Sequence, residues 1–259
     1  MTSRVVFDDL ESLSRAAADA IAARLREAVA ARGRCSFVLT GGRTPRRMYE
    51  LLGERHRDDV PWHRVDLFWG DERYVPPDHP HSNYGLARTS LLERVAPPPG
   101  NVHPIPTYHG DPAAGALAYE ALLQDYFRGR EPVFDLLLLG MAANGHVASL
   151  FPRHPALHER ARWIVAVEVP ADPPQRITVT FPLINRARAV IFFVAGPAKA
   201  EAVARALAPG TTVDEIPAVG VRPVAGEVRW WLDRQAAALL PRVTVNGRAA
   251  GNASTSDRG

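Results

Sequence analysis

The chain has 259 residues, of which 46% are hydrophobic and 23% charged, a composition that fits one large α/β domain or two small ones. Its formal charge is only +3 and its arginines are scattered, which argues against nucleic-acid binding. The single cysteine, Cys35, excludes an intrachain disulfide and lies in an apolar run, so a buried, inert thiol is expected. No apolar run approaches the roughly 18 residues of a membrane span and the N-terminus lacks a signal-peptide core, so we expect a cytoplasmic protein without a membrane partner.

The first part of the chain predicts a helix, a strand and a second helix. Apolar residues recur at steps of three or four through residues 9–32, which indicates an amphipathic helix that Gly33 ends. The apolar run 35–40 predicts a strand. Thr44 as N-cap and Pro45 in the first turn predict that a helix begins directly after it.

The rest of the chain repeats this alternation. A strand at 64–69 precedes a long polar loop over residues 70–83, in which Ser82 can cap a helix that runs to about residue 94. Asp111 and Pro112 are typical of the cap and first turn of another helix. The remaining expected elements are strands at 133–139, 162–169, 176–181, 188–195 and 228–233, and helices at 196–207 and 233–240.

Strands that alternate with helices predict an α/β fold with a parallel sheet, mixed at its edges, and helices on both faces. Continuous apolar runs such as "LLLL" and "VIFFV" are typical of strands covered on both sides. We expect a single α/β domain over residues 1–242. Residues 243–259 are small and polar, which predicts a flexible tail.

Four of the expected strands are each followed by glycine and then by polar or charged residues. These groups are Gly41, Gly42, Arg43 and Thr44 after the first strand, Gly70, Asp71, Glu72 and Arg73 after the second, Gly140, Asn144, Gly145 and His146 after the third, and Gly196 and Lys199 after the fourth. Because ligands of open parallel sheets bind at the carboxyl ends of the strands, the sequence predicts a site where these loops meet.

The first of these loops has the features of a phosphate site. Gly41 and Gly42 before a helix expose backbone N–H groups, which together with the helix dipole attract an anion. A plain tight turn is the alternative interpretation of the glycine pair, but cations in several converging loops favour phosphate. Lys199 is the only lysine among 31 basic residues, either by chance or because arginine would not serve there.

His146 is a candidate for acid–base chemistry, because histidine exchanges a proton near neutral pH. The alternative is an ordinary loop histidine. The sequence has no G-x-S-x-G nucleophile motif, no H-E-x-x-H or cysteine-rich metal motif and no nucleotide-binding glycine motif. Neither a metal nor a cofactor is therefore expected.

Five segments together carry a family resemblance. They are "LTGGRTP", "LFWGDERYVP" with "SNY" after it, "LLLLGMAANGHVASLFP", "PPQRITVTFPLIN" and "VAGPAKAEAV", in this order between about residues 36 and 240. They resemble the 6-phosphogluconolactonases, and the "ASLFP" continuation separates them from the related glucosamine-6-phosphate deaminases. The resemblance implies a Rossmann-like fold and metal-independent hydrolysis of 6-phosphoglucono-δ-lactone to 6-phosphogluconate, in the pentose phosphate pathway.

By resemblance, His146 is the general base that activates water. Asp71, with Glu72, holds the second loop in place. The residues that surround the phosphate and sugar acid are Gly41, Gly42, Arg43, Thr44, Arg73, Arg176 and Lys199. The chain also departs from the family pattern, because Ala142 replaces a glycine, Asn144 an aspartate and Arg43 a small serine. Asn144 cannot ionise, but it can accept a hydrogen bond from His146.

Two other functions stay open from the sequence. One is a sugar-phosphate isomerase or deaminase on the same fold, and the other is a sugar-phosphate-binding regulator whose site Asn144 has weakened. The expected partner is a phosphorylated sugar lactone, and the expected state is a monomer or weak homodimer.

Overall fold

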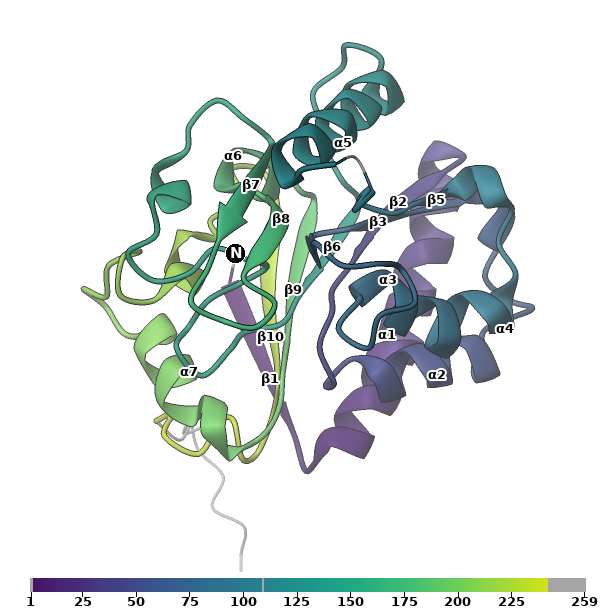
Figure 1. Cartoon of the computed structure of the whole chain (residues 1–259). Coiled ribbons are helices and arrows are strands. Elements are labelled where there is room, and N and C mark those ends of the chain that lie inside the picture. Colours follow the sequence, from purple (N-terminus) through teal and green to yellow (C-terminus); the bar gives the residue numbers. More distant parts are fainter. Residues whose placement is uncertain (1, 109, 242–259) are drawn as a thin grey trace, which may run out of the picture.

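The computed structural model describes residues 2–108 and 110–241, and a seven-stranded sheet runs through its centre (Figure 1). Every pair of neighbours in this sheet is parallel. In spatial order the strands are β1 (Thr2–Phe7), β10 (Glu227–Asp233), β9 (Ala189–Val194), β6 (Leu136–Leu139), β2 (Cys35–Leu39), β3 (Val65–Trp69) and β5 (Val102–His103). The expected α/β fold with a parallel sheet is confirmed, but the expected mixed edges are wrong, because the antiparallel pairs lie in a separate sheet.

The antiparallel strands gather in a second, three-stranded sheet. Its order is β4 (Asp71–Arg73), β8 (Gln175–Val179) and β7 (Ile164–Glu168). Strand β4 was expected to belong to a long loop. Its pairing partner β8 lies about a hundred residues further along the chain, so no local sequence pattern predicts that β4 is a strand.

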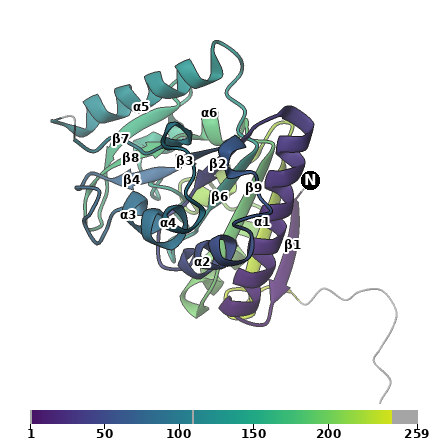
Figure 2. The same ribbon diagram turned by 90° about the vertical axis from the view of Figure 1, so that its right-hand side faces the viewer.

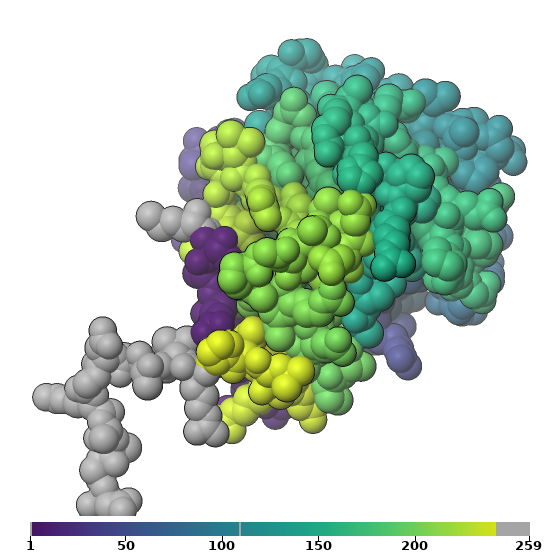
Figure 3. Space-filling view, turned by 90° about the vertical axis from the view of Figure 1, so that its left-hand side faces the viewer, coloured from purple at the N-terminus to yellow at the C-terminus, as the bar shows by residue number. Residues whose placement is uncertain are grey.

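Helices cover both sides of the large sheet (Figures 1 and 2). On one side lie α1 (Leu10–Arg32), α2 (Arg46–Arg55), α3 (Asn83–Ala87) and α4 (Glu93–Val95). The second sheet lies on the other side with α5 (Pro112–Phe127), α6 (Phe181–Ile184) and α7 (Ala200–Leu207). Figure 3 shows this second side, where the green segments between about residues 150 and 225 form most of the surface.

Three predicted helix ends are confirmed by their caps. Gly33 closes α1 in the left-handed conformation, with φ 78°. Ser82 Oγ accepts the backbone N–H of Gly85 at the start of α3, and Asp111 accepts that of Ala114 at the start of α5. The single helix expected from Ser82 to residue 94 is divided, because a π-helical stretch at Arg88–Leu92 separates α3 from α4.

Two local predictions are wrong. Thr44 does not cap α2, which begins at Arg46 without any side-chain capping bond. The helix expected at 233–240 is a series of turns. The Asp233 carboxylate binds the N–H groups of both Ala236 and Gly196, which ties this segment to the loop after β9.

Strand β1 was not predicted. It lies at the edge of the sheet, where Val5 and Val6 are both about half exposed, at 45% and 46%. The segment therefore lacks the continuous apolar run of the central strands, in which all five residues of β2 are buried. Cys35 in β2 is one of them, and burial raises the pKa of its thiol well above the ordinary value, so the expectation of an inert cysteine is met.

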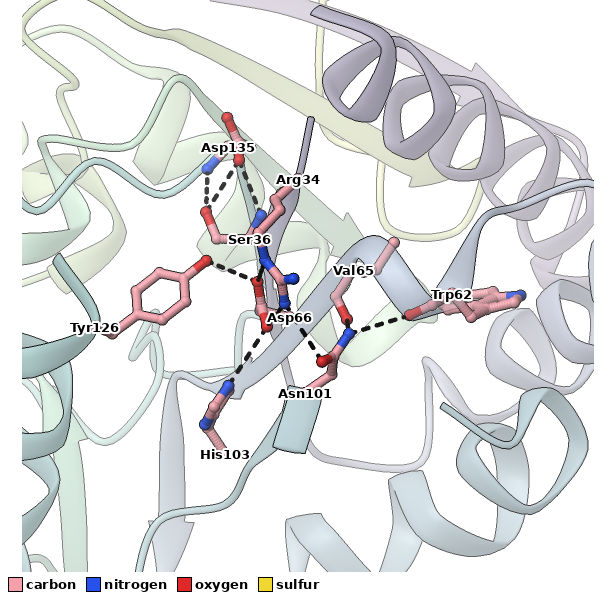
Figure 4. A network of polar contacts seen from close by, with 9 residues as sticks. All are labelled: Arg34, Ser36, Trp62, Val65, Asp66, Asn101, His103, Tyr126 and Asp135. Atoms are coloured by element: carbon pink, nitrogen blue, oxygen red, sulfur yellow. Dashed lines mark hydrogen bonds and ion pairs between the residues drawn. The ribbon is translucent and has the colours of Figure 1, made fainter. Parts of the chain in front are cut away.

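A polar network joins the amino ends of β2 and β3 to α5 (Figure 4). The Asp66 carboxylate is 1% exposed and accepts hydrogen bonds from Arg34 at 2.6 and 2.9 Å and from the Tyr126 hydroxyl at 2.9 Å. Nearby, Asp135 accepts the backbone N–H and the hydroxyl of Ser36. The network lies at the opposite ends of the strands from the predicted site, so it stabilises the fold without bordering that site.

Candidate active site

The four predicted loops follow four adjacent strands, in the order β9, β6, β2 and β3. Their carboxyl ends therefore meet, as the sequence predicts, and they enclose a pocket of about 400 Å³. Among its lining residues are nine of the ten predicted site residues, namely Gly41, Gly42, Arg43, Thr44, Asp71, Arg73, His146, Arg176 and Lys199. The tenth, Asn144, does not line the pocket, but its side chain contacts Nδ1 of His146.

The loop after β2 presents backbone N–H groups to this pocket. A Cβ atom at Gly41 would overlap the Asn83 carboxamide, so only glycine fits there. Gly42 has φ 88°, a conformation that glycine adopts without strain. Within the described part of the chain, the N–H groups of residues 41–44 donate to no other group. The turn therefore offers a set of free donors for an anion.

Two arginines lie side by side on the next wall. Arg73 and Arg176 are direct partners in the antiparallel β4–β8 pair, where like charges repel each other. Arg176 is 4% exposed and its Nε donates to the Pro173 carbonyl, while Arg73 donates to the His81 carbonyl. Burial and the nearby Arg73 lower the pKa of Arg176. An anion between the two guanidinium groups would relieve this repulsion.

Lys199 closes the other side of the pocket. It lies at the end of a short 3₁₀ turn, Pro197–Lys199, directly before α7. Its side chain is half-buried, and burial together with the charge of Arg43 lowers its pKa. A phosphate dianion would counteract this lowering of the Lys199 pKa, because its negative charge favours the protonated amine.

The ring of His146 is held on two sides. It stacks on Phe151 with ring centroids 3.9 Å apart, and its Nδ1 lies 2.8 Å from Oδ1 of Asn144. That same oxygen accepts the backbone N–H of His146 at 3.2 Å, which fixes the orientation of the amide. Nδ1 must therefore carry the ring proton, and Nε2 is the basic nitrogen. Burial and the charges of Arg176, Lys199 and Arg73 lower the pKa of His146 to about 3.

The turn that carries His146 has little room for change. Gly145 has φ 81°, and a Cβ atom there would lie 2.8 Å from the Ile216 side chain. The Gly145 N–H donates to the Ala142 carbonyl, and the Ala142 N–H donates to the His146 carbonyl. These bonds fix His146 at the mouth of the pocket.

Asp71 is a buried anchor for two neighbouring loops. Its carboxylate accepts the Ser149 hydroxyl at 2.7 Å and the Asn83 amide at 3.2 Å. Neither Asn83 nor Ser149 was among the predicted site residues, although the motifs "SNY" and "ASLFP" contain them. Phe151 was missed in the same way, because its role depends on the ring contact with His146 and not on its own chemistry.

Glu72 holds the loop that follows β4. Its two carboxylate oxygens accept the backbone N–H groups of Arg73, Asn83 and Tyr84 and the Ser82 hydroxyl, all within 3.1 Å. Burial raises its pKa to about 7, against the effect of the three backbone donors. With its acceptor positions occupied, Glu72 is a structural group and not a free base.

The described residues contain neither a cluster of metal-binding side chains nor a membrane-spanning helix. No group of three or more histidine, cysteine, aspartate or glutamate side chains in residues 2–108 and 110–241 is arranged to hold a metal ion. No helix in this part of the chain is both long and apolar enough to cross a membrane.

Comparisons with known proteins agree with this geometry. Residues 8–230 match the family model described as glucosamine-6-phosphate isomerases/6-phosphogluconolactonase. A 6-phosphogluconolactonase of Synechocystis sp. is 44% identical over 219 residues, which is 83% of this chain and 89% of the relative. That of Mycobacterium leprae is 42% identical over 245 residues, or 91% of this chain and 97% of the relative.

A solved structure extends the similarity to the fold. The 6-phosphogluconolactonase from Trypanosoma brucei superimposes with a TM-score of 0.82 at 27% identity, over 93% of this chain and 99% of that one. The family match over residues 8–230 includes the second sheet and all four loops around the pocket.

Proposed function

The chain belongs to the family of glucosamine-6-phosphate isomerases and 6-phosphogluconolactonases, and we propose that it hydrolyses 6-phosphoglucono-δ-lactone with water activated by His146. Relatives at 41–44% identity are 6-phosphogluconolactonases, and the chain is an enzyme of this class, a carboxylic ester hydrolase of the pentose phosphate pathway. The observation that carries the catalytic proposal is the free Nε2 of His146 at the edge of a cation-lined pocket.

The reaction needs a base, a donor for the carbonyl oxygen and an anchor for the phosphate. Nε2 of His146 takes a proton from water, and the hydroxide adds to the lactone carbonyl carbon. The ring C–O bond then breaks, and the imidazolium returns the proton to the departing oxygen. Asn144 holds the ring in the tautomer that this step requires.

The remaining predicted residues bind the substrate in this proposal. The free N–H groups of residues 41–44, with Arg43 and Lys199, attract the phosphate. Arg73 and Arg176 provide cationic N–H groups for the sugar acid and for the negative charge that develops on the carbonyl oxygen. Asp71 positions the loops and takes no part in proton transfer, because both of its oxygens already accept hydrogen bonds.

The decisive experiment is a hydrolysis assay of freshly prepared lactone, with the spontaneous reaction subtracted. Saturable acceleration supports the proposal. Release of ammonia from glucosamine 6-phosphate would instead indicate a deaminase, and binding of 6-phosphogluconate without turnover of lactone would indicate the regulator. The names of the relatives do not favour either alternative.

Three broader expectations belong to the same proposal. The enzyme acts in the cytoplasm, uses no nucleic-acid partner and is a monomer or weak homodimer. Analytical ultracentrifugation of the purified chain tests the state of association, and fractionation of the producing cell tests the location.

A further inference from the structure

Asn144 and Gly145 form an Asn-Gly pair in the turn that carries the proposed general base, and Gly145 is buried there. Asn144 is exposed, and its amide nitrogen bonds to no other residue in the described part of the chain. Its Oδ1 accepts two hydrogen bonds from His146, at 2.8 Å from Nδ1 and 3.2 Å from the backbone nitrogen. Asparagine is a thermolabile residue, above all where glycine follows, since no side chain then hinders the next backbone nitrogen.

We propose that Asn144 is a deamidation site, at which the native protein slowly converts asparagine into aspartate or isoaspartate. The Gly145 nitrogen loses its proton and attacks the Asn144 side-chain carbon, forming a C–N bond and a tetrahedral oxyanion on Oδ1. The bond to Nδ2 breaks, ammonia leaves and a succinimide ring remains. Water then opens either carbonyl of this ring, and the product carries a carboxylate in place of the amide.

Two features of the turn act in opposite directions on this reaction. The Gly145 N–H donates to the Ala142 carbonyl at 2.9 Å, and because Gly145 is buried, the need to break this bond lowers the reactive population by about 5- to 150-fold. The two donors from His146 already point at the oxygen on which the negative charge develops. In enzymes a single donor of this kind changes rates by about 10²–10³. We therefore expect the two donors from His146 to offset the loss of deamidation rate that the turn bond causes.

Deamidation would change the charge next to the general base. The aspartate product places a carboxylate oxygen where Asn144 Oδ1 now lies, within hydrogen-bond reach of Nδ1, which is 2.8 Å away. The isoaspartate product adds a methylene group to the backbone of the turn and displaces His146. The effect of either product on turnover rests on the proposed function, whereas the modification itself does not.

The chain contains its own reference for the rate. Asn246 and Gly247 form a second Asn-Gly pair, followed by Arg248 instead of histidine. The purified full-length chain is kept in mildly alkaline buffer made with heavy-oxygen water until half of Asn246 has been converted. Peptide mass spectrometry then measures the exchange of NH₂ for OH, and the incorporated heavy oxygen, at each site. Asn144→Asp supplies the standard that separates aspartate from isoaspartate, and Asn144→Gln identifies the peptide without a reactive asparagine.

The expected result is conversion of Asn144 at a rate no more than about 150-fold below that of Asn246, the largest protection that the turn bond allows. Slower conversion than this overturns the proposal, because the turn then protects the site. The two proposals fail separately. Modified Asn144 in a protein that does not hydrolyse lactone rejects only the function, and an active enzyme with intact Asn144 rejects only the deamidation.

Discussion

Asn144 holds His146 through its amide oxygen, 2.8 Å from Nδ1, and so orients the imidazole without placing a charge beside it. An aspartate in the same position would also stabilise the imidazolium that forms as water is deprotonated. Orientation and charge stabilisation are therefore separate in this chain. Three cations of the pocket, Arg73, Arg176 and Lys199, also favour the neutral ring over the imidazolium.

The pH dependence of kcat/KM should reveal this difference. Burial and three cations lower the pKa of His146 to about 3, so the free enzyme keeps a neutral base from mildly acid to alkaline pH and loses it only as the pH falls toward that value. Asn144→Asp should raise the pKa and move the acid limb to higher pH. The phosphate of the substrate titrates near pH ~6 in both enzymes, so the difference between the two profiles isolates His146.

The same pair of enzymes tests how much a charge contributes to the rate. Because orientation is already complete, Asn144→Asp should increase kcat by no more than roughly tenfold, about 1.4 kcal/mol. A thousandfold increase in kcat would contradict this prediction and would show that the natural chain is a catalytically impaired enzyme. In that case the regulator becomes the better hypothesis.

Replacement of His146 should remove general-base catalysis while the fold stays intact. His146→Ala should lower kcat by at least the ~10²-fold that is typical of a lost general base. His158→Ala is a matched control, because this histidine is 54% exposed and pairs with Asp214 away from the pocket. Near-normal turnover by His146→Ala, with the spontaneous reaction subtracted, would rule out the assignment.

Lys199→Ala should act on binding. If Lys199 contacts the phosphate, loss of one charged hydrogen bond costs about 1.5–3 kcal/mol and raises KM by roughly 10- to 100-fold, with a smaller change in kcat. Arg43→Ala should have a weaker effect, because Arg43 is exposed and well hydrated. Steady-state kinetics of both variants give the comparison. A fall in kcat at constant KM would assign Lys199 to the transition state, and a complex with 6-phosphogluconate in which Lys199 points away would refute the contact.

The sequence predicted the pocket because its glycine-led loops follow strands that alternate with helices. That pattern alone brings residues 41–44, Arg73, His146 and Lys199 to one edge of a parallel sheet. Arg176 is different. It comes from β8, whose antiparallel pairing with β4 no periodicity in the sequence reveals, and only the family resemblance pointed to it.

The residues that the sequence did not reveal act through contacts. Asn83 fills the space above Gly41, Ser149 binds Asp71 and Phe151 stacks on His146. Each of these side chains has an ordinary structural use elsewhere in proteins, so its type carries no signal. The errors at Thr44 and at residues 233–240 have a related cause, because local capping and helix propensity were overruled by the path that the sheet imposes on the chain.

Asp66 provides a test of stability that leaves the pocket untouched. Burial acts to raise its pKa, but contacts from His103, Arg34 and Tyr126 outweigh burial and hold the pKa below its ordinary value. A lowered pKa in the folded state means that the ionised carboxylate adds stability above the unfolded pKa of about 3.9, and that this stability is lost as the pH falls further. Asp66→Asn keeps the shape and removes the charge.

At neutral pH, Asp66→Asn should lower the free energy of unfolding by about 1–3 kcal/mol, since Arg34 and Tyr126 keep only a neutral acceptor. Thermal unfolding should show a drop of roughly 2–4 °C per kcal/mol. Asp58→Asn is the matched control, because its side chain is 99% exposed. The difference between the wild type and Asp66→Asn should narrow in acid, while kcat and KM stay those of the wild type, because the network lies at the opposite ends of β2 and β3 from His146. A difference that stays constant down to pH ~2 would show that packing, and not the carboxylate charge, makes the contribution.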